Sequence, residues 1–185
     1  FRSMARSMPQ FALLLILILL PLQMLSGGVT PLESMQAMFA RAQNEGRDLF
    51  EFEAKTLLRE HGIAVAEEFV AHGADELAAA VAKFGTQPLA MKVVSKDILH
   101  KSDAGGVKLN LVGEAALRAA FEQIMTSCRA YDANADIRGV LVTPMARKGT
   151  EVIIGVVRDP IFGPVLMFGL GGIFVEILED VAFRA

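Results

Sequence analysis

A lysine inside an apolar run is the residue of this sequence whose type and position best suit chemistry on a phosphate. Lys92 carries the one charge in LAMKVV (89–94), and such a run is typical of a strand buried on both faces. A buried ammonium is costly unless an anion or an acidic side chain meets it. Lys92 is therefore a candidate phosphate ligand. The alternative is a lysine that reaches past the sheet edge into solvent.

The loop after this run combines cationic and hydroxyl side chains with a glycine pair. Gly105 and Gly106 would let backbone N–H groups approach a ligand, beside Lys101 and Ser102, so the loop could cradle phosphate oxygens. A tight hairpin turn explains the glycine pair equally well. Because neither GxxxxGK[ST] nor GxGxxG is present, the loop is neither a Walker loop nor a dinucleotide-binding turn.

His100 lies in the same loop, directly before Lys101. An imidazole at this position could carry a proton or act as a nucleophile toward phosphorus. The alternative is a solvent-exposed loop histidine. We assign structural roles to the other two histidines, His61 and His72.

A second glycine-containing stretch, FGPVLMFGLGGIFVE (162–176), marks a tight turn after an apolar strand. Glu176 follows these glycines, and Glu151 opens the preceding strand. The two carboxylates could therefore face one cleft, as a Mg-nucleotide or a charged phosphoryl group requires. The alternative for each glutamate is a solvated charge at a strand edge.

The elements that must position these residues are helices alternating with strands. Capping patterns at Thr30 and at Asp48 with Glu51 predict two early helices, the first ending before Gly46 and the second at His61. Two more helices are predicted over 75–84 and 114–130. The predicted strands are 63–71, 89–94, 106–111, 139–143, 151–157 and 164–169. This order predicts an α/β or α+β domain with a mixed sheet.

Two patterns within these elements make specific predictions about side chains. GVKLNL (106–111) alternates strictly, which predicts Val107, Leu109 and Leu111 on one face of a half-buried strand. Cys128 falls on the apolar stripe of the helix over 114–130, which favours a structural thiol over a reactive one.

Composition excludes several classes of function. The 185 residues carry a formal net charge of −3 and no run of lysines and arginines, which argues against nucleic acid as a partner. The single cysteine allows no internal disulfide, which fits a reducing compartment. No Cys/His spacing suits a structural zinc site.

The apolar fraction of 53% has its excess in residues 11–25. Two arginines before this run and small residues after it resemble the regions of a secretory signal peptide. The run is also near the lower limit for a membrane span, which needs about 20 apolar residues. The other interpretations are a packed helix and non-native sequence at the start of a fragment. Membrane association is expected only through this run.

Five stretches of the chain carry a family resemblance. They are EFEAKTLLREHGIAV (51–65), MKVVSKDILHKSDAGGV (91–107), GVLVTPM (139–145), GTEVIIGVVRDPIFGPV (149–165) and MFGLGGIFVEILEDVAFR (167–184). Together they resemble the ATP-grasp domain of the ADP-forming acyl-CoA synthetases, or acetate–CoA ligases (ADP-forming), which are related to the succinyl-CoA synthetase β subunit. The resemblance covers about residues 48–185, and LHKSDAGGV and FGLGGIFVE are its most specific blocks.

The resemblance implies an ATP-grasp fold of the α/β (α+β) class, in which two subdomains flank a nucleotide cleft. It also implies that the chain is truncated at its C-terminal end and carries an extra apolar N-terminal helix. The expected divisions are an atypical apolar segment over 1–30, a helical lead-in over 31–66, a first subdomain over 67–141 and the start of a second over 142–185.

Carried over to this sequence, the resemblance implies roles for single residues. Lys92 would contact ATP phosphates, Val142 to Met145 would form the hinge beside the adenine, and Glu151 would bind the ribose or adenine side. His100 would carry a phosphoryl group, and Glu176 would stabilise the phosphohistidine. The implied nucleotide-binding residues are Lys92, Lys101, Ser102, Gly105, Gly106, Val142, Thr143, Met145 and Glu151. Thr143 and Pro144 stand where many ATP-grasp proteins have a hinge glutamate.

The reaction implied by the resemblance converts acyl-CoA, ADP and phosphate reversibly to carboxylic acid, CoA and ATP through an acyl phosphate and a phosphohistidine. ATP or ADP and Mg²⁺ would be the cofactors, with the metal ligands beyond Ala185. The implied partner is a CoA-binding and ligase domain or subunit, and the expected location is the cytoplasm. The alternatives are a nucleotide-binding regulatory half of an acetyltransferase-fused protein-acylation enzyme and a secreted or membrane-tethered binding module without enzymatic activity.

Overall fold

The computed structural model describes residues 31–171 and 181–184, so the apolar run over 11–25 and Glu176 lie outside the described residues. The chain divides into two compact units. One comprises Met38–Ala146, and the described residues of the other are 31–37, 147–171 and 181–184. Within the described ranges, no helix is long and apolar enough to cross a membrane. The predicted domain boundaries stay predictions.

A four-stranded sheet forms the centre of the unit Met38–Ala146. Its strands are β1 (Phe69–Ala71), β2 (Leu89–Ser95), β3 (Val107–Leu111) and β4 (Ile137–Pro144), in the spatial order β1-β4-β2-β3. Every pairing among the described strands is antiparallel, so the predicted mixed sheet is wrong. The reason is that β2 lies between β3 and β4, which run in the same direction but do not pair.

The helices agree with the sequence patterns over most of their length. The structure contains α1 (Pro31–Asn44), α2 (Glu51–Glu60), a 3₁₀ turn η2 (Ala74–Glu76), α3 (Leu77–Phe84) and α4 (Gly113–Tyr131). The cap predicted from Asp48 and Glu51 is wrong. Helix α2 begins two residues later than that cap requires, and the carboxylate of Glu53 accepts the N–H of Phe50 at 2.9 Å. The strand predicted over 63–71 is confirmed only at Phe69–Ala71, which pairs with β4.

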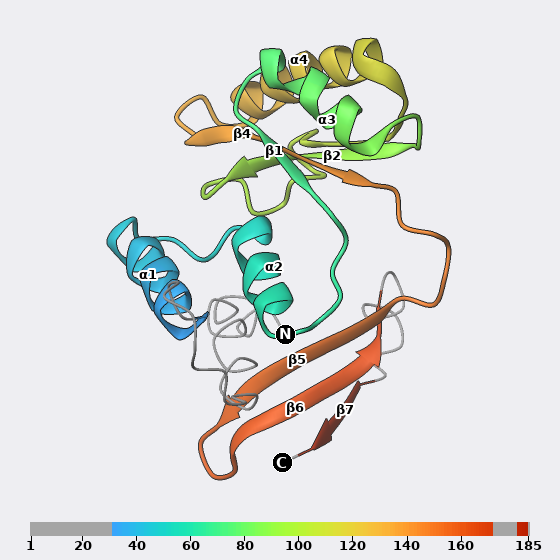
Figure 1. Ribbon diagram of the computed structural model, residues 1–185. Coiled ribbons are helices and arrows are strands. Elements are labelled where there is room, and N and C mark those ends of the chain that lie inside the picture. The colour runs from blue at the N-terminus through green and yellow to red at the C-terminus, as the bar shows by residue number, and fades with distance from the viewer. Residues whose placement is uncertain (1–30, 172–180, 185) are drawn as a thin grey trace. The chain divides into compact units, whose positions relative to one another are not determined.

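One face of the sheet packs against α3 and α4 (Figure 1). Alternation along β2 directs Leu89, Met91 and Val93 to this face, and all three side chains are almost fully buried. The stripe of α4 meets them, and its buried members are Leu117, Ala120, Phe121, Ile124 and Cys128. The predicted structural position of Cys128 is therefore confirmed, and burial raises the pKa of its thiol.

The opposite face of the sheet packs against the start of α2. Phe50 contacts Val94 and Leu141 in a small apolar cluster, and Phe52 joins it from the side. The two phenylalanine rings stack with their centroids 5.7 Å apart. Residues 90, 92 and 94 of β2 point to this face because they alternate with the buried residues 89, 91 and 93.

Strand β3 departs from the strict alternation that its sequence suggested. Lys108 pairs with Met91 and Leu111 with Leu89, so β3 holds one more residue than β2 over this interval. The extra residue makes a β-bulge next to Asn110, whose φ is +58°. Val107 therefore shares a face with Lys92, whereas Leu111 packs in the core under α4. The prediction that Val107, Leu109 and Leu111 share one face is wrong, and Leu109 is 54% exposed.

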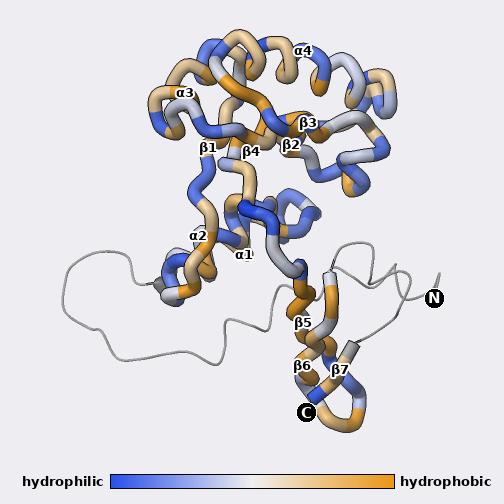
Figure 2. Tube along the Cα trace, turned by 90° about the vertical axis from the view of Figure 1, so that its right-hand side faces the viewer, coloured by the Kyte–Doolittle hydropathy of each residue, from blue (hydrophilic) through white to orange (hydrophobic). Residues whose placement is uncertain are grey.

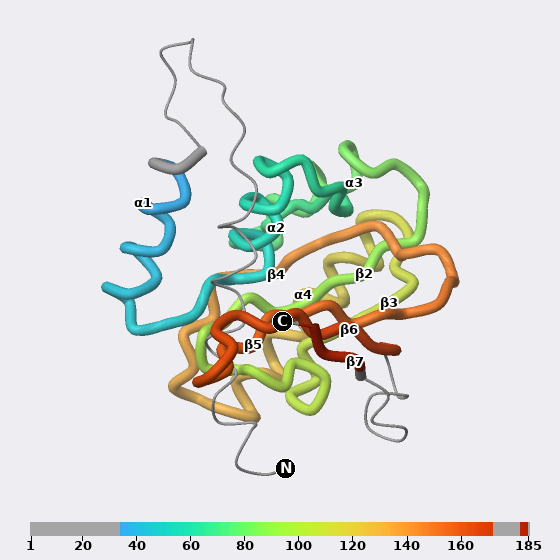
Figure 3. The backbone as a smooth tube through the Cα atoms, turned by 90° about the horizontal axis from the view of Figure 1, so that it is seen from below, coloured from blue at the N-terminus to red at the C-terminus, as the bar shows by residue number. Residues whose placement is uncertain are grey.

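The second unit contains an antiparallel sheet of three strands, β5 (Val152–Asp159), β6 (Gly163–Leu170) and β7 (Val181–Arg184), in that order (Figure 3). The turn between β5 and β6 is closed by Asp159, whose Oδ1 accepts the N–H groups of Ile161 at 2.8 Å and Phe162 at 2.9 Å. Much of β5 and β6 is hydrophobic (Figure 2). One face of the sheet exposes large apolar side chains, namely Val152, Ile154, Leu166 and Phe168.

Candidate functional site

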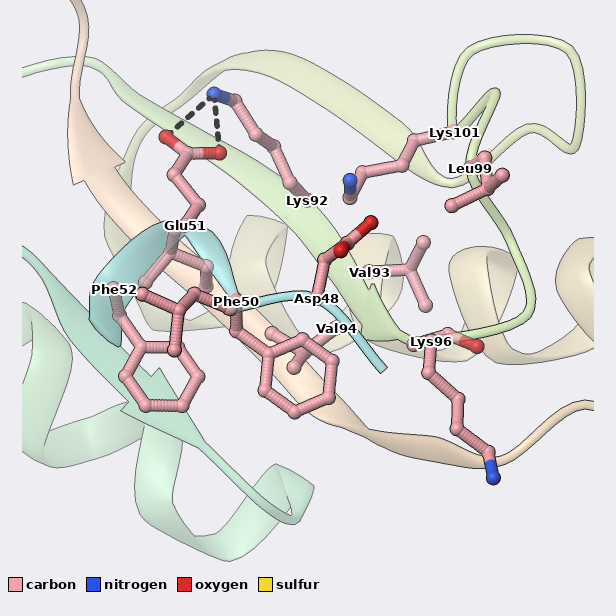
Figure 4. Close-up of a pocket in the computed structure, with 13 residues that line it drawn as sticks. Asp48, Phe50, Glu51, Phe52, Lys92, Val93, Val94, Lys96, Leu99 and Lys101 are labelled. Carbon is pink, nitrogen blue, oxygen red and sulfur yellow. Dashed lines mark hydrogen bonds and ion pairs between the residues drawn. The ribbon is translucent and has the colours of Figure 1, made fainter. Parts of the chain in front are cut away.

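A pocket lies on the face of the four-stranded sheet that packs against α2 (Figure 4). One wall is the segment Asp48–Phe52, which leads into the first turn of α2. The other wall is Lys92–Lys96 from β2 and the residues after it, and Leu99, Lys101 and Leu141 complete the lining. Below, the α2-face pocket means this pocket. It brings Lys92 and Lys101 together, two of the residues predicted to bind nucleotide.

Lys92 reaches the α2-face pocket from the middle of β2, and a carboxylate meets it there. Its Nζ lies 3.0 Å from Oε1 and 3.1 Å from Oε2 of Glu51 (Figure 4). The side chain of Lys92 is 34% exposed and that of Glu51 33%. Because β2 has a neighbour on each side, Lys92 does not reach past a sheet edge. The acidic partner that the sequence required for this lysine is Glu51.

The pair Lys92–Glu51 belongs to a row of four alternating charges. Lys55 Nζ lies 2.7 Å from Oε1 of Glu51 and 3.2 Å from Oε2 of Glu68, whose side chain is only 9% exposed. Burial alone would raise the pKa of Glu51, but hydrogen bonds from Lys55 and Lys92 lower it overall. Burial opposes the charge of Lys55 in the same way, yet the two glutamates raise its pKa overall. Glu51 and Lys55 therefore both stay ionised near neutral pH.

A second ionic network holds the wall of the pocket that precedes α2. Arg47 donates to both carboxylate oxygens of the buried Glu53, at 2.6 and 3.0 Å, and its guanidinium lies 4.0 Å from the ring centre of Phe50. Arg138, from β4, reaches Glu45 at 2.6 Å. Hydrogen bonds outweigh the effect of burial and lower the pKa of Glu53. We had not singled out these residues from the sequence, because only the fold brings them together.

The loop that carries His100 turns its glycine amides inward. The N–H of Gly105 donates to the carbonyl of Ser102 at 3.0 Å, and that of Gly106 to the carbonyl of Lys101 at 2.7 Å. His100 is exposed, and no described residue makes a hydrogen bond or ion pair with its ring. Its neighbour Leu99 is 73% exposed. The loop thus presents the imidazole to solvent beside the α2-face pocket.

Close packing accounts for both glycines of this loop. A Cβ on Gly106 would lie 2.6 Å from Cγ1 of Val93 and 3.1 Å from Sγ of Cys128. Gly105 has a φ of +67°, and a Cβ there would lie 2.9 Å from Cβ of Ser127. The loop therefore lies directly against α4, and a role for these two glycines in binding phosphate stays a prediction.

The segment predicted to be a hinge leaves the sheet at the end of β4. Val142 is fully buried and faces α3 and α4, away from the α2-face pocket. Thr143 is 7% exposed, and the N–H of Met145 donates to the carbonyl of Pro88 at 2.9 Å. This amide is therefore already satisfied within the protein. The assignment of the segment to the adenine stays a prediction.

Glu151 belongs to the unit with the three-stranded sheet, where it is exposed. Its carbonyl accepts the N–H of Gly171 at 2.8 Å, and a Cβ on that glycine would lie 3.1 Å from the backbone of Glu151. The backbone of Glu151 thus comes too close to position 171 for a side chain to fit easily, which explains why a glycine stands there. The expected cleft between Glu151 and Glu176 stays a prediction, because Glu176 lies outside the described residues.

Residues able to hold a metal ion do not gather in the described part of the chain. No group of three or more His, Cys, Asp or Glu side chains has the arrangement for a metal there. Of the two carboxylates that line the α2-face pocket, that of Glu51 is engaged with two lysines, which does not suit Mg²⁺ ligation. The expectation that Mg²⁺ ligands lie elsewhere stays a prediction.

Comparison with known families and proteins gives matches that cover most of the chain. The model of the ATP-grasp domain family matches residues 40–185. The β subunit of acetate–CoA ligase [ADP-forming] I from Pyrococcus furiosus is 50% identical over 144 residues, which are 78% of this chain and 62% of that subunit. A 36-residue match of another kind, 72% identical to part of the inner membrane transport permease YhhJ of Escherichia coli, covers 20% of the chain.

Two solved structures of one protein extend the comparison to the fold. Acetyl-coenzyme A synthetase 1 from Ca. Korarchaeum cryptofilum, in complex with coenzyme A, Ca-AMPCP and HgCl⁺, matches with a TM-score of 0.75 and 42% identity. This match covers 80% of this chain and 65% of that one. The same synthetase with Mg-AMPPCP, its phosphohistidine segment pointing towards the nucleotide binding site, gives a TM-score of 0.66 at 39% identity, covering 80% and 62%. The chain thus spans somewhat less than two thirds of the length of that β subunit and of these two synthetase chains.

Proposed function

The chain belongs to the ATP-grasp family, and we propose that it is the nucleotide-binding part of an ADP-forming acyl-CoA synthetase. The observation that carries the proposal is the α2-face pocket. In this pocket Lys92, from the middle of the four-stranded sheet, points its ammonium at the carboxylate of Glu51. The 50% identity to a β subunit of an ADP-forming acetate–CoA ligase supports the class of reaction.

Lys92 is the proposed ligand of the nucleotide phosphates. Its ammonium is held over the pocket, and Lys101 lines the same pocket from the His100 loop, while Lys96 extends away from the Lys92–Glu51 pair (Figure 4). Charge-assisted contacts from lysine to phosphate are strong because the site is partly shielded from water. The proposed nucleotide site also includes Ser102, Gly105, Gly106, Val142, Thr143, Met145 and Glu151.

His100 is the proposed phosphoryl carrier. In the direction of ATP synthesis, its ring nitrogen would attack the phosphorus of an acyl phosphate, forming a P–N bond and releasing the carboxylate. The phosphoryl group would then pass to the terminal oxygen of ADP as the P–N bond breaks, yielding ATP and free imidazole. The exposed position of His100 suits a residue that must meet more than one substrate. Glu176 is proposed to stabilise the charged phosphohistidine.

The remaining parts of the reaction are proposed for other portions of the enzyme. A CoA-binding and ligase domain or subunit would convert acyl-CoA and phosphate to the acyl phosphate and CoA. Mg²⁺ would neutralise phosphate charge when bound, and its ligands are expected outside the described residues. The proposed location is the cytoplasm.

Nucleotide titration of the purified chain tests the role of Lys92. Loss of one charge-assisted contact weakens binding by about tenfold or more, so Lys92→Ala should raise the Kd for ATP and ADP by that factor. The matched control is Lys108→Ala, because Lys108 lies on β3 and points to the other face. Absence of nucleotide binding by the unmodified chain, or an equal loss in both variants, would contradict the proposal.

Labelling with ATP that carries a radioactive γ-phosphate tests the role of His100. Together with the parts of the enzyme that supply the Mg²⁺ ligands, the chain should acquire an acid-labile label, and His100→Asn should remove part of it. The control is His61→Asn, since His61 lies at the end of α2, where its Nδ1 is 2.8 Å from the carbonyl of Leu57. Label that persists undiminished in His100→Asn would show that another residue carries the phosphoryl group.

A further inference from the structure

The ammonium of Lys92 is not free in the α2-face pocket, because it is paired with the carboxylate of Glu51. Both carboxylate oxygens lie within 3.1 Å of Nζ, as the phosphate oxygens of a nucleotide would. A nucleotide phosphate that binds Lys92 therefore competes with this carboxylate for the hydrogen bonds of the ammonium. The inference below rests on the proposed function and concerns Glu51, to which neither the sequence resemblance nor the comparisons assign a role.

The surroundings of Glu51 allow Lys92 to leave without stranding a charge. Lys55 lies 2.7 Å from the same carboxylate and would remain its partner. Lys55 is in turn held by Glu68 at 3.2 Å, so the row of charges stays paired when its terminal lysine moves away. Glu51 also lies in the first turn of α2, where the partial positive charge of the helix stabilises a carboxylate.

We propose that Glu51 is an internal competitor of the nucleotide: it holds Lys92 in the α2-face pocket, releases it to a phosphate, and is then neutralised by Lys55. Glu51 is thus a positioning residue that acts through Lys92. Its charge lowers affinity for nucleotide, and in exchange the ammonium is held at the pocket before the ligand arrives. Lys55 has the opposite effect, because it weakens the hold of Glu51 on Lys92 by sharing the carboxylate.

Two substitutions in one helix should therefore change nucleotide affinity in opposite directions. Glu51→Gln removes the competing charge and should lower the Kd for ADP about twofold to fivefold, the range set by a partly exposed ion pair. Lys55→Gln leaves Lys92 as the one remaining lysine partner of Glu51 among the described residues, and should raise the Kd about twofold to fivefold. A purely structural role for either residue would change stability without this opposition of sign.

The experiment is calorimetric titration of the full chain with ADP and with ATP, on the unmodified protein and both variants. Glu114→Gln serves as the control, because it breaks a comparable exposed pair with Arg118 in α4, away from the pocket. Thermal unfolding of each variant verifies the fold. If Glu51→Gln does not fold, Glu51→Asp retains the negative charge at the helix start but shortens the reach to Lys92, and should also tighten binding.

Combining the substitutions with Lys92→Ala separates competition from simple repulsion. In the Lys92→Ala background, Glu51→Gln should leave the Kd unchanged, because no lysine remains to be released. An equal gain in affinity with and without Lys92, or weaker binding by Glu51→Gln, overturns the inference while the proposed function stands. If the unmodified chain binds no nucleotide, the proposed function fails and the inference with it.

Discussion

The two faces of the four-stranded sheet differ in what they bury. The face under α3 and α4 is a continuous apolar core in which Leu117, Ile124 and Cys128 are fully inaccessible to solvent. The α2 face carries a small aromatic cluster and, beside it, the charged residues Glu51 and Lys92. One strand, β2, contributes to both. Because successive side chains of a strand point to opposite faces of the sheet, a single strand can stabilise the unit on one face and present a charged ammonium on the other.

This difference separates the residues that maintain the fold from those that we propose to bind nucleotide. Substitutions under α3 and α4 should change stability and leave affinity unchanged in the folded protein. Substitutions of Lys92 and Lys101, which line the α2-face pocket, should change affinity and leave stability nearly unchanged. The following predictions test this division, beginning with the largest expected effect.

The largest effect on stability is expected from Leu117→Ala, on the face of the sheet that packs against α3 and α4. Leu117 is 0% exposed in the core under α4, and truncation of a buried leucine leaves a cavity that costs about 2–5 kcal/mol. Urea unfolding followed by circular dichroism measures this loss. Leu109→Ala is the control, because a side chain 54% exposed should contribute about 0.5 kcal/mol or less. Equal losses in the two variants would contradict the assignment of the core to the α4 face.

An intermediate effect is expected from Glu53→Gln at the start of α2. Its carboxylate accepts two hydrogen bonds from Arg47 and one from the N–H of Phe50, and loss of charged hydrogen bonds costs about 1.5–3 kcal/mol. Glu122→Gln, on the exposed side of α4, is the control. A loss no larger than that of the control would show that the network does not hold the wall of the pocket.

The same carboxylate predicts the direction of the pH dependence. Hydrogen bonds lower the pKa of Glu53 in the folded protein below its ordinary value of 4.5, despite burial. Its contribution to stability is therefore fully present above that value and is lost as the pH falls through the folded pKa. The melting temperature should therefore fall as the pH drops below about 4.5, and it should fall less in Glu53→Gln. Parallel curves for the two proteins would contradict this assignment.

The smallest effect is expected at the bulge of β3. Asn110 has a φ of +58°, a conformation that costs most residues about 1 kcal/mol but that asparagine and glycine tolerate. Asn110→Ala should therefore destabilise the protein by about 1 kcal/mol, and Asn110→Gly by less. If denaturant unfolding showed a larger loss of stability for Asn110→Gly than for Asn110→Ala, the bulge would not explain why Val107 and Leu111 lie on opposite faces.

Local patterns of the sequence predicted those features whose cause is local. The spacing of apolar residues in α4 predicted the buried position of Cys128, and the apolar run around Lys92 predicted both its strand and its need for an anionic partner. Strict alternation over 106–111 was misleading, because one added residue in β3 moves Leu111 to the other face relative to Val107. The bulge depends on pairing with β2, which the sequence of β3 does not contain.

The partner of Lys92 was not predictable in the same way. Glu51 lies 41 positions earlier and meets the lysine only because Phe50 and Phe52 pack α2 on the sheet. The ion pairs of Arg47 and Arg138 arise from the same packing. The sequence therefore predicted two residues that line the α2-face pocket, Lys92 and Lys101, whereas the competing carboxylate of Glu51 could be found only from the fold.

Hydrogen–deuterium exchange with and without ATP tests the difference between the two faces most directly. The account predicts that nucleotide slows exchange in the segments lining the α2-face pocket, at 48–52 and 92–101, and leaves the segment 117–128 of α4 unchanged. Protection confined to α4, or no change at the α2-face pocket under saturating ATP, would contradict it.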